Sequence, residues 1–281
     1  MSLHDSCILV ALRVTLPPQT RTSKHASAEV EYKYRTAKKQ GRVTKRLFSD
    51  TDIKPLSKAM TEARTTFNEI SLPYDASYRL IPSSTYFEFT QTMTELSQKF
   101  DTKKMEFLRN YPDILHRAEA ALGDLFDHDN YPSTTRLDNI VNFSIESSVV
   151  PPVNAFDDLA GITAAEIEVL KEQALAGQNE KVEQALGDLF QRLFDALSKA
   201  KTKLAVEDSV FRDTLLSNIH DSLRAVDTLN FAKNQDLIDL ANEVRTLVDG
   251  ISPQALRDDK ELRKQTAEET QEVLKKMQEF F

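Results

Sequence analysis

The chain has 281 residues and a formal net charge of -8, with 40% hydrophobic and 28% charged residues. This composition is typical of a folded protein, and the length allows one large domain or two smaller ones. A single cysteine, Cys7, excludes an intramolecular disulfide framework and fits a reducing cytosol. No apolar run approaches the roughly 20 residues of a membrane span, and no signal peptide is recognisable, so we expect a cytoplasmic protein without a membrane segment.

Three segments alternate between apolar and polar residues or are short and extended, which predicts strands: Cys7–Leu16, Tyr74–Ile81 and Val141–Val150. Between them, apolar residues at steps of three and four predict helices. One helix should begin near Asp50–Asp52, and another should carry the stripe from Tyr86 to Phe107. Tyr111-Pro112 should break or kink the second helix, and the polar stretch 127–139 is typical of a turn-rich connector.

The segment Arg21–Arg46 stands out by its charge. It holds nine Lys/Arg and two Glu, a balance of +7, whereas the rest of the chain holds 27 Lys/Arg and 42 Asp/Glu, a balance of -15. Two local structures fit it equally well. A helix capped by Ser27 can run to Gln40 before Gly41, and the alternation of Val30, Tyr32 and Tyr34 suits a strand.

The C-terminal half consists of apolar stripes with helical spacing. They predict one long helix, three shorter helices and a final helix that ends in MQEFF. We therefore expect an α+β, mostly α-helical fold, with long antiparallel helices in a bundle and a small β element built from short strands. The pair Pro151-Pro152 places the domain boundary in Val150–Ala155, which gives an N-terminal α+β region at 1–154 and a helical bundle at 155–281.

The sequence carries no recognisable catalytic signature. Its five histidines have no metal-ligand spacing, and no glycine-rich nucleotide motif or nucleophile elbow is present. Asp124, Asp127, His128 and Asp129 are the best candidates for a metal site, but a polar helix end explains them better because the EF-hand pattern is missing. We expect a protein that is not an enzyme and needs neither a metal nor another cofactor.

Two stretches are candidate binding sites. Cations interleaved with aromatic rings can bind phosphates and stack bases, and segment 21–48 has this pattern. The alternative is a solvated charged face. The candidate nucleic-acid-binding residues are Tyr32, Lys33, Tyr34, Arg35, Lys38, Lys39, Arg42, Lys45 and Arg46. At the chain end, Met277, Phe280 and Phe281 are candidates for partner binding, and the alternative is that they pack back into their own bundle.

Several segments follow one another in a recognisable order: ILVALRVTL, GRVTKRLFSDTDIKPLSKAMTEART, SYRLIPSSTYFEFTQTM and FLRNYPDIL, and the long C-terminal run from FRDTLLSNIH to DDKELR. In this order they resemble a domain-of-unknown-function family of tailed phages and prophages. Members of that family tend to be encoded near MoxR-type AAA+ ATPases and proteins with von Willebrand A-type domains. The resemblance implies a non-enzymatic partner of an ATP-driven remodelling machine in the cytoplasm of a bacterial host, and it supplies no catalytic residues.

Two functions remain open from the sequence. In the first, the protein is a helical interaction, adaptor or assembly module that docks on a MoxR-type AAA+ ATPase, on another protein or on itself as a homo-oligomer. In the second, it binds nucleic acid, in particular single-stranded DNA during phage replication, recombination or packaging, through the basic and aromatic segment 21–48. The excess of negative charge elsewhere means that a nucleic acid would have to approach the basic segment alone.

Overall fold

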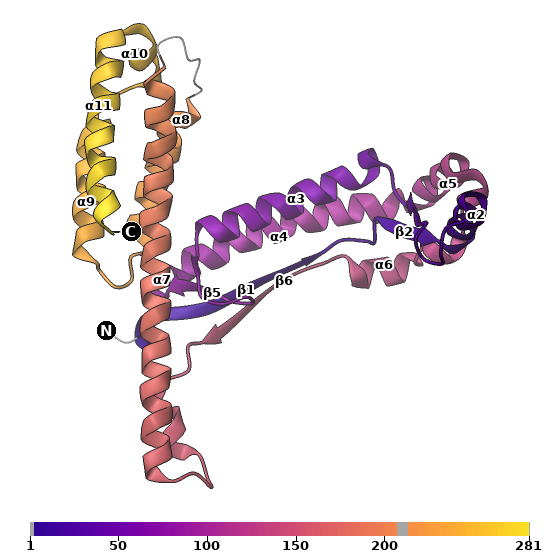
Figure 1. Cartoon of the computed structure of the whole chain (residues 1–281), viewed down its shortest axis with the longest axis horizontal. Helices are drawn as coiled ribbons and strands as arrows, with labels where there is room; N and C mark the ends of the chain where they lie inside the picture. The colour runs from indigo at the N-terminus through magenta and orange to yellow at the C-terminus, as the bar shows by residue number, and fades with distance from the viewer. Residues whose placement is uncertain (1–2, 207–212, 281) are drawn as a thin grey trace. The chain divides into compact units, whose positions relative to one another are not determined.

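The computed structural model describes residues 3–206 and 213–280 of the chain, and it is mostly helical with a small antiparallel sheet (Figure 1). The expected fold class is therefore confirmed. The four-stranded sheet has the order β4-β5-β1-β6, and a second sheet pairs β2 with β3.

The chain forms two compact units. Unit 1 contains Met1–Ala11, Asn68–Phe89 and Ser147–Phe281, and unit 2 contains Leu12–Phe67 and Thr90–Glu146. We had expected one boundary in Val150–Ala155. The division falls elsewhere because the N-terminal strand and the segment after residue 67 supply core residues to the same cluster as the C-terminal helices.

The strands lie close to where the sequence places them. β1 is Cys7–Thr15 and β6 is Asn142–Val149, while β4 (Leu72–Pro73) and β5 (Arg79–Pro82) form the middle extended element. β1 pairs antiparallel with β5, with Cys7 opposite Pro82 and Val10 opposite Arg79. The Asp75 side chain accepts the N–H groups of Ser77 and Tyr78 (2.6 and 2.7 Å), which closes the turn between β4 and β5.

The bundle of unit 1 is built on α7, a helix of 41 residues that runs from Ala164 to Leu204. Thr163 and Glu166 form a capping box at its start. The predicted C-terminal stripes all form helices, and α11 packs against both α7 and α9 (Figure 1). The other helices are α8 (Thr214–Leu229), α9 (Gln235–Val248), α10 (Pro253–Asp258) and α11 (Lys260–Met277).

Two arginine side chains of unit 1, Arg79 and Arg192, bind the backbone carbonyls of residues 68–71. The Arg192 guanidinium donates to the carbonyls of Asn68, Glu69 and Ser71 at 2.9, 2.7 and 2.7 Å, and it lies 2.7 Å from the Asp188 carboxylate. Arg79 donates to the Asn68 and Ser71 carbonyls as well. Asn68 and Glu69 are the last two residues of the helix Asp50–Glu69, and Ser71 lies just after it. Carbonyls at a helix C-terminus lack an intrahelical partner, so the two guanidiniums satisfy them.

Unit 2 is organised around helices and an aromatic cluster. Its helices are α2 (Lys24–Tyr34), α3 (Asp50–Glu69), α4 (Tyr86–Arg109), α5 (Tyr111–Leu122) and α6 (Thr134–Ile140), of which α3 and α4 extend into unit 1. Phe48 contacts the rings of Phe107 and Tyr131 edge-on, with centroids 5.5 and 5.9 Å apart. As predicted, the helix stops before Tyr111-Pro112. The connector after residue 126 is less irregular than expected, because Ser133 caps the short helix α6.

Candidate nucleic-acid interface

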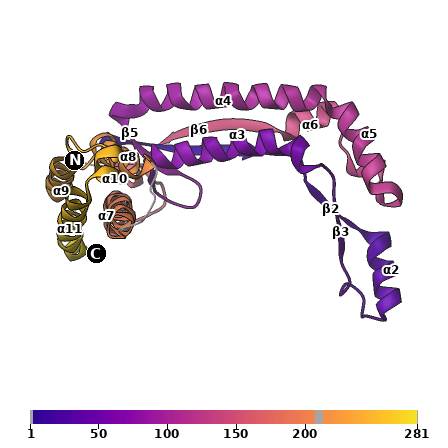
Figure 2. The same cartoon turned by 90° about the horizontal axis from the view of Figure 1, so that it is seen from above.

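The basic segment folds into a hairpin that carries a helix, α2 (Lys24–Tyr34) (Figure 2). Val30, Tyr32 and Tyr34 lie in this helix, so the helical alternative is the one found, and it ends at Tyr34 rather than Gln40. β2 (Thr20–Ser23) pairs antiparallel with β3 (Val43–Arg46), and α2 lies between them in the chain. Ser23, rather than Ser27, caps the helix by accepting the N–H of Ala26 at 3.3 Å. We call residues 20–46 the basic hairpin.

The tip of the basic hairpin, residues 35–42, is held against α2. The helix ends at Arg35 with a φ of 52°, and the Glu31 carboxylate accepts the backbone N–H of Lys39 at 2.5 Å. A Cβ at Gly41 would lie 3.0 Å from Val30 Cγ1, so the close approach of the returning chain favours glycine there. The cations of the tip are therefore presented on a folded loop.

Most cations of the basic hairpin are exposed, and they have no acidic partner among the residues that the structure describes. In the described part of the chain, no carboxylate lies within ion-pair distance of the side chains of Lys33, Arg35, Lys38, Lys39 and Arg42. The segment's two acids are already engaged, since Glu29 lies 3.5 Å from His25 and Glu31 binds the tip. The segment therefore presents a concentrated positive charge to solvent.

Two of the predicted phosphate ligands have other roles in the structure. Lys45 is 6% exposed, and its ammonium donates to the Leu125 carbonyl at 2.5 Å. This geometry does not favour a phosphate contact by Lys45, because its ammonium is buried and already donates to a carbonyl at the base of the hairpin. Arg46 is exposed and pairs with Asp50 at 2.6 Å, which reduces its free charge.

The two tyrosines are among the most exposed aromatic side chains that the structure describes. Tyr32 is 89% exposed and Tyr34 is 67% exposed. Residues two apart on a helix point to different sides, so the helical conformation separates the two rings. The Lys33 ammonium lies 5.7 Å from the centroid of the Tyr34 ring, a cation–π contact that occupies one face of that ring. Tyr32 has both faces open within the described contacts.

The C-terminal candidates differ from one another. Met277 is fully buried in the bundle and is unable to contact a partner directly. Phe280 is 45% exposed and stacks on Phe190, with ring centroids 5.2 Å apart. For both side chains the structure favours the alternative in which they pack on their own bundle. Phe281 lies outside the described residues.

The candidate metal ligands of the sequence do not come together among the described residues. Those residues contain no group of three or more potential metal ligands, and Asp127, from the metal candidate, instead accepts the N–H of Asp129 at 3.1 Å. Burial raises the pKa of the Cys7 thiol to about 12, which keeps it protonated at neutral pH.

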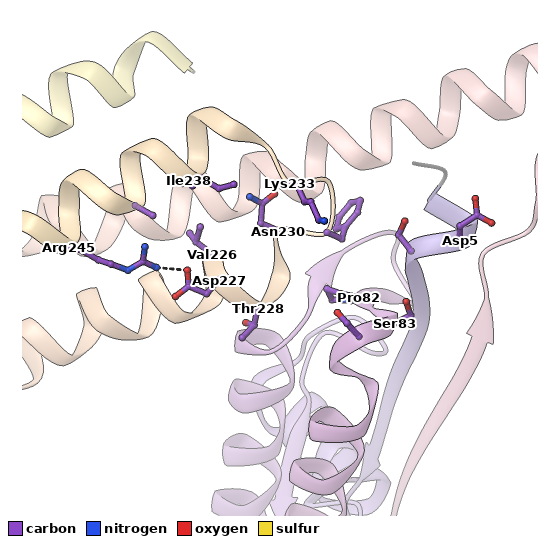
Figure 3. Close-up of a pocket in the computed structure, with 14 residues that line it drawn as sticks. Asp5, Pro82, Ser83, Val226, Asp227, Thr228, Asn230, Lys233, Ile238 and Arg245 are labelled. Carbon is purple, nitrogen blue, oxygen red and sulfur yellow. Dashed lines mark hydrogen bonds and ion pairs between the residues drawn. The ribbon is translucent and has the colours of Figure 1, made fainter.

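The sequence did not reveal a groove of about 570 Å³ in unit 1 (Figure 3). Pro82, Ser83, Asn230 and Lys233 are among the residues that line it. Arg245, which also lines the groove, is engaged by an ion pair with Asp227, as the dashed line in Figure 3 shows. Because the charges of Arg245 and Asp227 neutralise each other, the groove presents a mixed polar surface. Its residues come from segments far apart in the chain, so no local pattern predicts it.

The fold and the surface define a mostly helical α+β protein with an exposed basic hairpin. Within the described ranges, no helix is both long and apolar enough to cross a membrane. Residues 5–244 match the family described as Protein of unknown function (DUF3150), and the chain belongs to this family. The match includes the basic hairpin and ends within α9, before α11. No curated protein and no solved structure matches the chain.

Proposed function

We propose that the protein binds nucleic acid, with the basic hairpin as its contact surface and single-stranded DNA as the preferred form. The observation that carries this proposal is the set of exposed cations at the tip, none of which has an ion-pair partner among the described residues. Phosphates attract such cations, and binding releases counterions from the nucleic acid.

The aromatic side chains favour a single strand over a purely acidic protein partner. Tyr32 offers an open ring next to the cations, and unpaired bases stack on such rings with little dependence on sequence. The net charge of -15 outside residues 21–46 disfavours wrapping of a strand around the rest of the protein. The contact is therefore local, and we expect a short binding site.

Fluorescence anisotropy with a labelled poly-dT oligonucleotide tests this proposal. The variant K38Q/K39Q/R42Q removes three cations of the tip, and we expect it to weaken binding by at least about tenfold at low salt. The control K54Q/K58Q/R109Q removes two exposed lysines and one exposed arginine of α3 and α4, so it changes the net charge by the same amount. The control should retain the wild-type affinity.

Equal loss of affinity in both variants would mean that binding follows net charge rather than the basic hairpin. A wild-type protein that fails to bind the oligonucleotide at low salt would contradict the proposal outright. A duplex of the same length serves as the second ligand, and tighter binding of the duplex would reject the preference for a single strand.

An adaptor or assembly function is the second candidate. It is supported by α7, whose first turns after the capping box carry Val169 and Leu175, both exposed, close in sequence to the exposed Leu159. A MoxR-type AAA+ ATPase of phage or prophage origin is the partner that we propose for this function. Stable co-elution of the two purified proteins after nuclease treatment would support it, and separate elution would count against it.

A further inference from the structure

Polar contacts attach helix α2 to the returning chain of the basic hairpin. The helix, all of which the structure describes, buries one of its eleven residues. The Ser27 hydroxyl accepts the N–H of Val43 at 3.0 Å, where β3 begins. Four residues further along α2, the Glu31 carboxylate accepts the N–H of Lys39 at 2.5 Å. Side chains four apart lie on the same face of a helix, so Ser27 and Glu31 form one polar seam along the returning chain.

Glu31 contacts the tip of the basic hairpin at two points. Its backbone carbonyl accepts the N–H of Thr36 at 3.0 Å, and its carboxylate accepts the N–H of Lys39. Lys39 has a φ of 68°, in the left-handed region that a residue with a Cβ rarely adopts. Such a conformation persists where the surroundings hold it, and the Glu31 carboxylate is bonded to this same residue. We therefore expect the tip to lose its conformation without the carboxylate.

The charge of this carboxylate is unfavourable for phosphate binding. Glu31 is the one acidic residue from 30 to 49, and the cations of the tip surround it in the sequence. A negative charge there opposes the attraction of phosphates. Among the described residues, no ammonium or guanidinium lies within ion-pair distance of the Glu31 carboxylate, whose bond is to the backbone of the tip. This bond therefore acts on the shape of the tip and does not neutralise a particular cation.

We propose that Glu31 is a positioning residue of the basic hairpin: its carboxylate holds the tip in the conformation that presents Lys38, Lys39 and Arg42 to phosphates. This role rests on the proposed function, because it concerns the same surface. A loop that is ordered before binding loses less conformational entropy when it binds, so its affinity is higher. Glu31 thus acts through the tip and does not itself contact the nucleic acid.

Two comparisons at equal net charge separate position from charge. Glu31→Gln keeps an acceptor at the same reach, whereas Glu31→Ala has none, and both variants lose one negative charge. We expect Glu31→Gln to bind labelled poly-dT at least as tightly as the wild type, and Glu31→Ala to bind at least about threefold more weakly than Glu31→Gln. Glu31→Asp keeps the charge but is one methylene shorter, so it should bind more weakly than the wild type. Fluorescence anisotropy at low salt measures all four proteins.

Glu29 supplies the matched control. It is the other acid of the basic hairpin, and it lies 3.5 Å from His25. Glu29→Gln and Glu29→Ala should bind poly-dT equally. The independent readout is the solvent exchange of the Lys39 amide proton, measured by NMR without DNA. We expect the same slow exchange in the wild type and Glu31→Gln, and faster exchange in Glu31→Ala and Glu31→Asp.

Equal affinities of Glu31→Gln and Glu31→Ala would overturn the positioning role and leave the proposed function standing. A difference of the same size between the two Glu29 variants would overturn it as well, because helix propensity would then explain both. If the wild type fails to bind poly-dT, the proposed function is rejected together with the role of Glu31 in binding, and the exchange rates still decide whether Glu31 fixes the tip. If Glu31→Ala fails to fold, the comparison of Glu31→Asp with the wild type decides.

Discussion

Helices α11 and α2 are both rich in charged residues, yet they relate to their surroundings in opposite ways. α11 buries a stripe that includes Ala267, Val273, Leu274 and Met277. α2 buries Ala26 alone of its eleven residues. The charges of α11 surround a buried stripe and are explained by folding, because a helix at the surface of a bundle needs a polar outer face. The cations of the basic hairpin have no comparable stripe behind them, and this difference is the reason why we propose that they bind nucleic acid.

The largest expected effect concerns the bundle core. Leu193→Ala on α7 removes a fully buried side chain and leaves a cavity, so we expect the free energy of unfolding to fall by about 2–5 kcal/mol. Leu175→Ala, on the exposed part of the same helix, should change it by less than about 0.5 kcal/mol. Urea denaturation measures both. Similar losses at the two positions would contradict the assignment of the core.

Removal of the Arg192 guanidinium should cause the next largest loss in the free energy of unfolding. Arg192→Ala leaves carbonyls of residues 68–71 with fewer donors and the Asp188 carboxylate without its partner, so we expect a loss of about 1.5–3 kcal/mol. Arg224→Ala on α8 removes an exposed pair with a distance of 3.7 Å and should cost less than about 0.5 kcal/mol. An Arg192 variant as stable as the wild type would show that these hydrogen bonds contribute nothing to folding.

A smaller effect should distinguish the two tyrosines of α2. If Tyr32 stacks a base, Tyr32→Ala should weaken poly-dT binding by about 1–3 kcal/mol. Tyr34→Ala should cost less, because Lys33 covers one face of its ring and the ring points to another side of the helix. Titration of each variant with labelled poly-dT, followed by fluorescence anisotropy, gives the loss of binding free energy for each substitution. Equal losses would argue against the assignment of Tyr32 as the stacking residue.

The sequence predicted the parts of the fold that depend on local periodicity. Stripes such as Leu189, Leu193 and Leu197 identified helices, and the alternation from Cys7 onwards identified β1. The state of residues 21–46 stayed open because Val30, Tyr32 and Tyr34 fit both periods. The burial of Lys45 depends on a carbonyl 80 residues away, and the division into units depends on which distant segments share a core. The residues next to Lys45 or next to the unit boundaries in the sequence therefore predict neither the burial nor the division.

The last prediction on stability concerns the buried weak acids Cys7 and Tyr111, whose pH-dependent effect on stability is absent at neutral pH and appears only at alkaline pH. Burial raises the pKa of Cys7 from 9.0 to about 12 and that of Tyr111 from 10.0 to about 12. Both groups bind their protons more tightly in the folded state, so their contribution to stability is complete below about pH 9. It is lost as the pH rises from about 9 or 10 toward 12. Urea midpoints that stay constant from pH 7 to about 8.5 and fall above pH 9 would agree, and Cys7→Ala should reduce the alkaline loss.

The salt dependence of DNA binding tests the central claim most directly. The affinity of the wild type and of K38Q/K39Q/R42Q for poly-dT should be measured from about 50 to 300 mM salt. Each phosphate contact to a single strand contributes roughly 0.7 to the slope of log affinity against log salt. We predict that the slope of the triple variant is smaller in magnitude by about 2, while K54Q/K58Q/R109Q keeps the wild-type slope. Identical slopes for the wild type and the triple variant would contradict the claim that the basic hairpin contacts the phosphates.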